Sequence, residues 1–261
     1  MDVNELITVL VPTSPVPSNP DTYILENTLK AIRFHLPTAK IIVLMDGVRP
    51  ACEPRRADYA EFKHRIKEKI TTGQYGNATF LEFSEWKLQA EMVRAALHYV
   101  STPLVFFNEH DATLVTTENP RDGSPDTLPQ DLKINWEVIA DFILMGGANT
   151  VRLYYVGERI LPEHGHLMHG EVTYQMEKFV RTTQFSGWPH ISSTEFYNQI
   201  FKTIFIPGRR EMMEGPMYGS VCAAPWEKFK TVIYYPDGNA RRFRHTNGRA
   251  LPDGNQEKAD W

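Results

Sequence analysis

Short apolar runs alternate with amphipathic segments over roughly the first 110 residues, and this alternation limits the possible folds more than any other feature of the chain. A short run of β-branched and other apolar residues predicts a buried strand, whereas apolar residues at intervals of three and four predict a helix. The predicted strands cover 6–11, 40–45, 78–83 and 104–108, and the predicted helices cover 22–36, 54–70 and 88–100. This order favours an α/β fold in which helices cover a parallel sheet.

The second half of the chain alternates less regularly. Residues 116–133 are polar and rich in proline, which indicates an exposed loop or a β-ribbon. The remaining predicted elements are a helix at 136–145, a strand at 150–156, helical patches at 173–179 and 193–201, a loop at 208–219, a strand at 230–235, a turn at 236–239 and a polar tail from 248. This mixture predicts a C-terminal region of less uniform architecture than the first half.

Composition excludes several classes of protein. With 42% hydrophobic and 23% charged residues, the chain of 261 residues is typical of a globular protein, and a net charge of -4 gives no general attraction to nucleic acid. Cys52 and Cys222 form neither a metal motif nor a disulfide framework, so we expect a reduced, cytoplasmic environment. The N-terminus does not resemble a signal peptide, and no apolar run approaches the ~18 residues that a membrane span requires. Glycine-rich dinucleotide and P-loop fingerprints are absent.

Two acids follow the predicted strand at 104–108. Because alternate residues of a strand share a face, Glu109 and Asp111 are expected to point the same way where the strand leaves the core. Neighbouring carboxylates repel each other unless a cation lies between them, and Mg²⁺ and Mn²⁺ prefer oxygen ligands of this kind. The pair therefore indicates either a divalent metal site or a solvated loop.

Other polar side chains follow the predicted strands in the same way. Thr13 and Ser14 follow the first strand, and Asp46 ends the second, where it either forms a turn with Gly47 or accepts a hydrogen bond from a base. Ligands of parallel α/β sheets bind at the carboxyl ends of the strands. We therefore expect these residues to lie near Glu109 and Asp111.

Three further groups of residues have side chains suited to catalysis or ligand binding. Glu211 and Glu214 precede a Gly-Pro turn, and either is a general base, a capping acid or part of a charged loop. The cluster of Arg241, Arg242, Arg244 and His245 suits phosphate binding or a solvated edge. The segment from Glu163 to Glu171 contains His164, His166 and His169, and histidine is a common zinc ligand, although the spacing matches no zinc motif. The segment indicates either a flexible loop or a lid over an acceptor site, or the metal site of a zinc hydrolase built on His164–Glu171.

The order of these pieces resembles the GT-A glycosyltransferases, particularly the family-2-like nucleotide-sugar transferases, over roughly residues 6–247. The segments that carry the resemblance are Leu-Ile-Thr-Val-Leu-Val-Pro-Thr-Ser at 6–14, Ile-Ile-Val-Leu-Met-Asp-Gly at 41–47, the helix at 87–97, Val-Phe-Phe-Asn-Glu-His-Asp at 105–111, Met-Met-Glu-Gly-Pro-Met at 212–217, and His245. Three features depart from the family pattern. The acidic pair after the acceptor region, Glu211 and Glu214, is split by two methionines, which leaves the choice of base open. Glu109 stands where the family carries an aspartate, and a proline-rich loop follows the first strand.

The resemblance implies a GT-A-type, Rossmann-like, mostly parallel sheet flanked by helices, with a mixed C-terminal acceptor region. It implies a nucleotide-sugar-binding half at 1–115, an acceptor-binding and catalytic half at 116–247 and a tail at 248–261. The implied reaction is metal-dependent, inverting transfer of a sugar from a nucleotide diphosphate sugar to a glycan or another hydroxyl-bearing acceptor. The altered acidic motif also keeps open a non-catalytic glycan- or nucleotide-binding module.

The resemblance also implies a role for each candidate residue. The implied nucleotide-binding residues are Pro12, Thr13, Ser14, Asp46 and Lys87; the ligands of Mn²⁺ or Mg²⁺ are Glu109, Asp111 and His245; and the catalytic base is Glu214 or Glu211.

Overall fold

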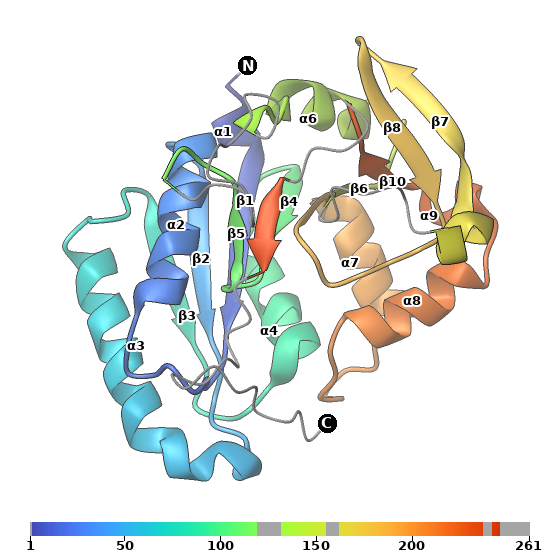
Figure 1. Cartoon of the computed structure of the whole chain (residues 1–261). Coiled ribbons are helices and arrows are strands. Elements are labelled where there is room, and N and C mark those ends of the chain that lie inside the picture. The colour runs from blue at the N-terminus through green and yellow to red at the C-terminus, as the bar shows by residue number, and fades with distance from the viewer. Residues whose placement is uncertain (1, 119–131, 155–161, 237–241, 246–261) are drawn as a thin grey trace.

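The first half of the chain forms the parallel part of one large sheet (Figure 1). The computed structural model describes residues 2–118, 132–154, 162–236 and 242–245. Strands β1 (Ile7–Thr13), β2 (Lys40–Met45), β3 (Ala78–Glu82) and β4 (Leu104–Phe107) pair in parallel in the order β3-β2-β1-β4. Between them lie α2 (Tyr23–His35), η1 (Pro50–Arg55), α3 (Arg56–Thr71), α4 (Leu88–Ala96) and η2 (Leu97–Tyr99), after the short α1 (Val3–Leu6). This confirms the predicted alternation.

Strand β1 is longer than predicted, because it continues through Pro12 to Thr13. Pro12 lacks the N–H that a central strand normally uses on one side. The β1–β4 pairing ends where Leu10 faces Phe107, so β4 requires no hydrogen bond from Pro12. The helix predicted at 88–100 is shorter in the structure, because α4 ends at Ala96 and Tyr99 is exposed.

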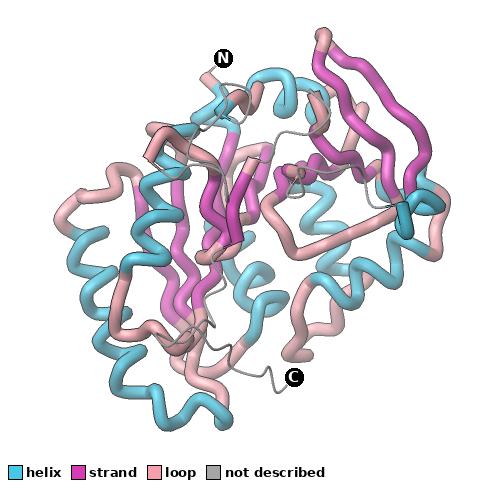
Figure 2. Tube along the Cα trace, viewed as in Figure 1, coloured by secondary structure: helices cyan, strands magenta, loops and turns pink. Residues whose placement is uncertain are grey.

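The second half adds further strands to the same sheet, coloured magenta in Figure 2, and these strands run in both directions. The full order is β3-β2-β1-β4-β9-β6-β10-β8-β7, and β9 and β8 run opposite to the other strands. The additional strands are β6 (Thr150–Leu153), β7 (Met168–Tyr174), β8 (Glu177–Thr182), β9 (His190–Ser193) and β10 (Thr231–Tyr234). The helices are α6 (Trp136–Leu144), η3 (Pro162–Leu167), α7 (Thr194–Thr203), α8 (Glu214–Cys222) and α9 (Trp226–Phe229). A separate two-stranded ribbon pairs β5 (Ala112–Leu114) with β11 (Phe243–His245).

Two predictions for the second half were wrong. The helical patch at 173–179 is the turn of the β7–β8 hairpin, in which Gln175 and Met176 adopt φ values of 46° and 70°. The loop at 208–219 gives way to a helix at Glu214. The turn at 236–239 lies almost entirely outside the described residues, as do most of the loop at 116–133 and the tail.

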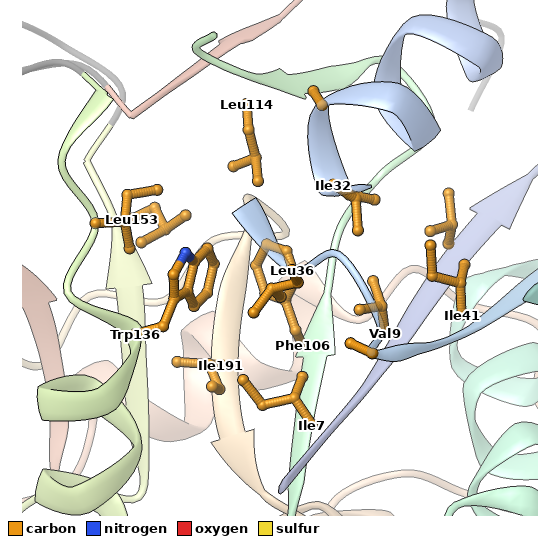
Figure 3. Packing of buried hydrophobic residues seen from close by; sticks show 14 of the residues in the cluster. Ile7, Val9, Ile32, Leu36, Ile41, Phe106, Leu114, Trp136, Leu153 and Ile191 are labelled. Atoms are coloured by element: carbon orange, nitrogen blue, oxygen red, sulfur yellow. The ribbon is translucent and has the colours of Figure 1, made fainter. Parts of the chain in front are cut away.

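Apolar side chains cover both faces of the sheet. Alternate residues of β1 and β2 point to opposite faces, as expected for strands that are buried on both sides. Helices α2, α3 and α6 cover one face. Figure 3 shows part of this packing, with Ile32 of α2 and Trp136 of α6 near Phe106 of β4. Helices α4, α7 and α8 cover the other face. Among the described residues, no helix combines the length and the apolar character needed to span a bilayer.

Candidate active site

Three predicted metal ligands come together at the carboxyl end of β4. One ligand atom from each of Glu109, Asp111 and His245 lies within 4.8 Å of the others, and His245 Nε2 is 3.3 Å from Asp111 Oδ2. The β5–β11 ribbon produces this arrangement, because His245 is directly opposite Ala112, the neighbour of Asp111. Two carboxylate ligands and one imidazole ligand form a donor set that suits a divalent cation such as Mn²⁺.

The two acids lie in a turn after β4, and not on one face of a strand as the sequence pattern had indicated. The Asn108 side chain is buried and donates to the carbonyls of Glu109 and Ala112, both at 2.9 Å. The Ala112 N–H also bonds the Glu109 carbonyl at 3.0 Å. Asn108 therefore holds the turn that brings the two carboxylates together.

Glu109 has an unusual protonation equilibrium. Burial is the main reason that its pKa rises to about 8, and the Asp111 carboxylate adds to the effect, followed by Glu214. The hydrogen bond from Gln89 and the proximity of His245 oppose the rise. A cation binding here would replace a proton on Glu109, so the residues present fit a metal.

Gln89 connects Glu109 to the segment that carries the candidate bases. Gln89 Nε2 donates to Glu109 Oε1 at 2.8 Å, and the Met213 N–H donates to Gln89 Oε1 at 3.0 Å. Because a backbone N–H can only donate, the amide orientation is determined and its NH₂ group must face Glu109. A further bond joins the Ala90 N–H to the Glu211 carbonyl at 3.1 Å. The start of α4 thus positions both the metal ligand and the base segment.

The two candidate bases differ in their surroundings. Glu214 is the first residue of α8 and is exposed, and its charge acts on both Glu109 and Arg152. Glu211 has a side chain that is 13% exposed and forms an ion pair with Arg209 at 3.2 Å. Glu214 is therefore the more accessible of the two carboxylates.

Asp46 is placed near the site, but its carboxylate faces the protein. It is 1% exposed and accepts backbone N–H groups from Lys87 at 2.7 Å, Gly47 at 2.8 Å and Leu88 at 3.1 Å. We therefore revise its predicted contact with a base. Asp46 holds the start of α4, where Leu88 has a φ of +58°.

The other predicted nucleotide-binding residues lie at the end of β1 and just before α4. Thr13 is buried, with its hydroxyl 3.2 Å from both the Leu44 carbonyl and the Tyr59 hydroxyl, and Pro12 is buried in β1. Ser14 is half-buried, and the Lys87 side chain is 38% exposed. Ser14 and Lys87 are thus the members of this set that remain accessible to a ligand.

The histidine-rich segment contributes less than a zinc site requires. His166 and His169 are exposed, and His169 Nε2 lies 2.9 Å from the Thr183 hydroxyl. The side chain of His164 lies outside the described residues. Within the described part of this segment, no group of three potential ligands converges.

Comparison with known proteins identifies the fold. No protein-family model matches the chain, and no curated protein matches it. Among solved structures, the mannosyltransferase PcManGT of Pyrobaculum calidifontis, described in complex with GDP-Man and Mn²⁺, is similar over 89% of this chain and 55% of that chain, with a TM-score of 0.54 and 14% identity. Residues 1–349 of TarS from S. aureus match over 93% of this chain and 61% of that chain, with a TM-score of 0.52 and 15% identity. GalNAc-T7, described with UDP, GalNAc and Mn²⁺, matches over 87% and 42%, with a TM-score of 0.55 and 8% identity.

These similarities confirm the predicted GT-A fold of nucleotide-sugar glycosyltransferases. The chain spans between 42% and 61% of the length of the three solved structures.

Proposed function

We propose that the protein transfers a sugar from a nucleoside diphosphate sugar to a hydroxyl group of an acceptor, with inversion at the anomeric carbon. The observation that carries this proposal is the convergence of Glu109, Asp111 and His245 at the carboxyl end of a central strand. In open α/β sheets this edge is where ligands bind. Solved structures that share the fold are described as complexes with GDP-Man and Mn²⁺, with UDP-GlcNAc, and with UDP, GalNAc and Mn²⁺, which supports the same class of donor.

The chain's own residues provide a defined setting for the diphosphate. Glu109, Asp111 and His245 would hold a divalent cation, which supplies positive charge to the diphosphate leaving group. Asn108 holds the turn between the two acids, while Gln89 fixes the direction of Glu109. We place the nucleoside near the ends of β1 and β2, where Ser14 and the Lys87 side chain are accessible.

Glu214 would act as the general base. Its exposed carboxylate begins α8, and its charge acts on the buried Arg152. Deprotonation of the acceptor hydroxyl by Glu214 prepares that oxygen for attack on the anomeric carbon from the side opposite the diphosphate. Glu211 is the weaker candidate because Arg209 already pairs with it.

A thermal-shift panel of nucleoside diphosphates, with and without Mn²⁺, tests the donor and the cation together. A ligand that binds only the native state at a hundred times its Kd stabilises it by about 2.7 kcal/mol. We expect the wild type to be stabilised by one nucleoside diphosphate in a Mn²⁺-dependent manner and Asp111→Ala to lose that response. Asp58→Ala, an exposed acid on α3, is the matched control and should respond like the wild type.

Donor hydrolysis distinguishes the enzyme from a binding module. The proposed function requires slow Mn²⁺-dependent hydrolysis of the sugar donor in the absence of an acceptor, because Glu214 can also activate water. Stabilisation by a nucleotide without any turnover would support the non-catalytic alternative. Equal responses of the wild type and Asp111→Ala would contradict the metal assignment.

A further inference from the structure

Arg152 is a charged residue in the middle of the sheet. It lies near the carboxyl end of β6 and is 9% exposed. The register places Phe107 of β4 opposite His190 of β9, and His190 opposite Arg152. Since neighbouring strands are about 4.8 Å apart, Arg152 lies roughly 10 Å across the sheet from Phe107, at the edge that carries Glu109.

The side chain of Arg152 lies on the face that α7 and α8 cover. Directly opposed residues of neighbouring strands share a face, and His190 stacks on Phe107 with ring centroids 5.2 Å apart. Phe107 packs in the cluster formed with α4, α7 and α8. Arg152 therefore lies on the face of the sheet that α4, α7 and α8 cover, and the charge of Glu214 at the start of α8 acts on it.

The guanidinium of Arg152 is incompletely hydrogen-bonded. Nη1 donates to the Gln184 carbonyl at 3.1 Å, whereas the buried Nε–H has no partner among the described residues. Burial lowers the pKa of Arg152 to about 10, and the Glu214 carboxylate opposes this, so the group stays cationic at neutral pH. Within the described residues, no ion pair within 4.0 Å joins Arg152 to Glu214, so the guanidinium has no carboxylate partner at hydrogen-bond distance there.

We propose that Arg152 binds an oxyanion of the acceptor, so that the acceptor carries a phosphate or carboxylate group near the hydroxyl that Glu214 activates. A guanidinium presents paired N–H donors that match the geometry of a phosphate or carboxylate. A buried cation with few partners is unfavourable unless an anion completes its environment. The subsite rests on the proposed function, since the acceptor role depends on Glu214 as the base.

The test uses the full chain with Mn²⁺ and a saturating nucleoside diphosphate, so that the donor site is filled. Orthophosphate and, separately, acetate are then titrated while thermal stability is measured. Arg152→Met is compared with Arg181→Met, a matched control in which the replaced arginine also has an unpartnered Nε but stacks on Trp226, with its guanidinium 4.9 Å from the ring. We expect at least one of the two anions to stabilise the wild type and the control further, and Arg152→Met to bind it roughly tenfold to a hundredfold more weakly.

Three results would overturn the subsite. Equal responses of the wild type and Arg152→Met would mean an adventitious ion only. Competition between orthophosphate and the nucleoside diphosphate would assign Arg152 to the diphosphate of the donor. No response of the wild type to either anion would remove the site.

If Arg152→Met does not fold, Arg152→Lys takes its place, because it keeps the charge but loses the paired donors and is expected to weaken anion binding. A wild type that no nucleoside diphosphate stabilises contradicts the proposed function and leaves the anion titration as a separate result.

Discussion

Replacing Gln89 with leucine is expected to lower both the stability of the fold and its affinity for a divalent cation. The Gln89 side chain is 4% exposed and makes two hydrogen bonds, one to Glu109 and one from the Met213 N–H. Leucine has a similar size, so the substitution removes the polar contacts with little change in volume. The variant therefore measures what these two contacts contribute.

The expected magnitude follows from the two contacts. Met213 is 1% exposed, so its N–H would lose its partner in a place that water does not reach, which costs about 1–3 kcal/mol. Loss of the bond to Glu109 adds about 1 kcal/mol. We expect the free energy of unfolding to fall by about 2–4 kcal/mol. Loss of a residue that orients a metal ligand typically lowers metal affinity by about tenfold to a hundredfold.

Urea denaturation and Mn²⁺ titration of the same variant give the two numbers. Gln199→Leu is the control, because Gln199 is exposed on α7 and its loss should change stability by no more than about 0.5 kcal/mol. If Gln89→Leu were destabilised but bound Mn²⁺ as tightly as the wild type, Gln89 would have a structural role alone. If Gln89→Leu matched Gln199→Leu in both measurements, the hydrogen bonds that Gln89 makes with Glu109 and Met213 would contribute neither to stability nor to Mn²⁺ binding.

Three further predictions concern the acids and the turn around them. Affinity for Mn²⁺, measured by calorimetry, should rise by up to about tenfold per pH unit towards pH 8. The reason is that the cation must displace the proton that the raised pKa of about 8 keeps on Glu109. The variant Glu109→Gln should bind Mn²⁺ more weakly and show no rise in affinity between pH 7 and 8. Gly47→Ala should lower the free energy of unfolding, measured by urea denaturation, by about 2 kcal/mol or more, because the added Cβ would lie 2.2 Å from a backbone carbon of Glu85. In the control Gly219→Ala the added Cβ meets open space, so that variant should not be destabilised by a comparable amount. Glu214→Gln should keep its affinity for the nucleotide but lose turnover by at least about a hundredfold in a donor-hydrolysis assay, and retained turnover would move the base role to another group.

The first half of the fold was predictable because its elements are defined by local patterns. In α2, the residues at helical spacing that predicted the helix are the residues that the structure buries, among them Leu25, Leu29 and Ile32. Strand β2 was predicted with the same limits that the structure shows. A strand that is buried on both faces gives a continuous apolar signal, which is easy to recognise in a sequence.

The second half depended on context that the sequence does not display. Helix α8 contains Gly215, Pro216 and Gly219, so a loop was predicted. Pro216 lies in the first turn, where backbone N–H groups have no partner within the helix, and the proline therefore does not disturb it. The β7–β8 hairpin was taken for a helix because its turn uses two non-glycine residues with positive φ, for which no local signal exists.

The candidate site was predicted as separate pieces, and its assembly was not predictable. Glu109 and Asp111 gave a local signal, but the approach of His245 depends on a ribbon of two three-residue strands that are far apart in the sequence. Gln89 and Arg152 gave none. A polar residue in a helix and a single arginine in a strand acquire meaning only from what long-range packing places beside them.

Strand β9 joins the two halves of the sheet, and this affects how the chain could be divided. It pairs with β4 on one side and with β6 on the other, so it closes the edge of the parallel half with residues from the second half. A fragment that ends near residue 115 would leave the buried Leu-Val-Phe-Phe of β4 as a bare edge. Such edges recruit strands from other molecules. The first fragment should therefore be recovered in soluble form only when a second fragment supplies β9, whether by co-expression or by mixing.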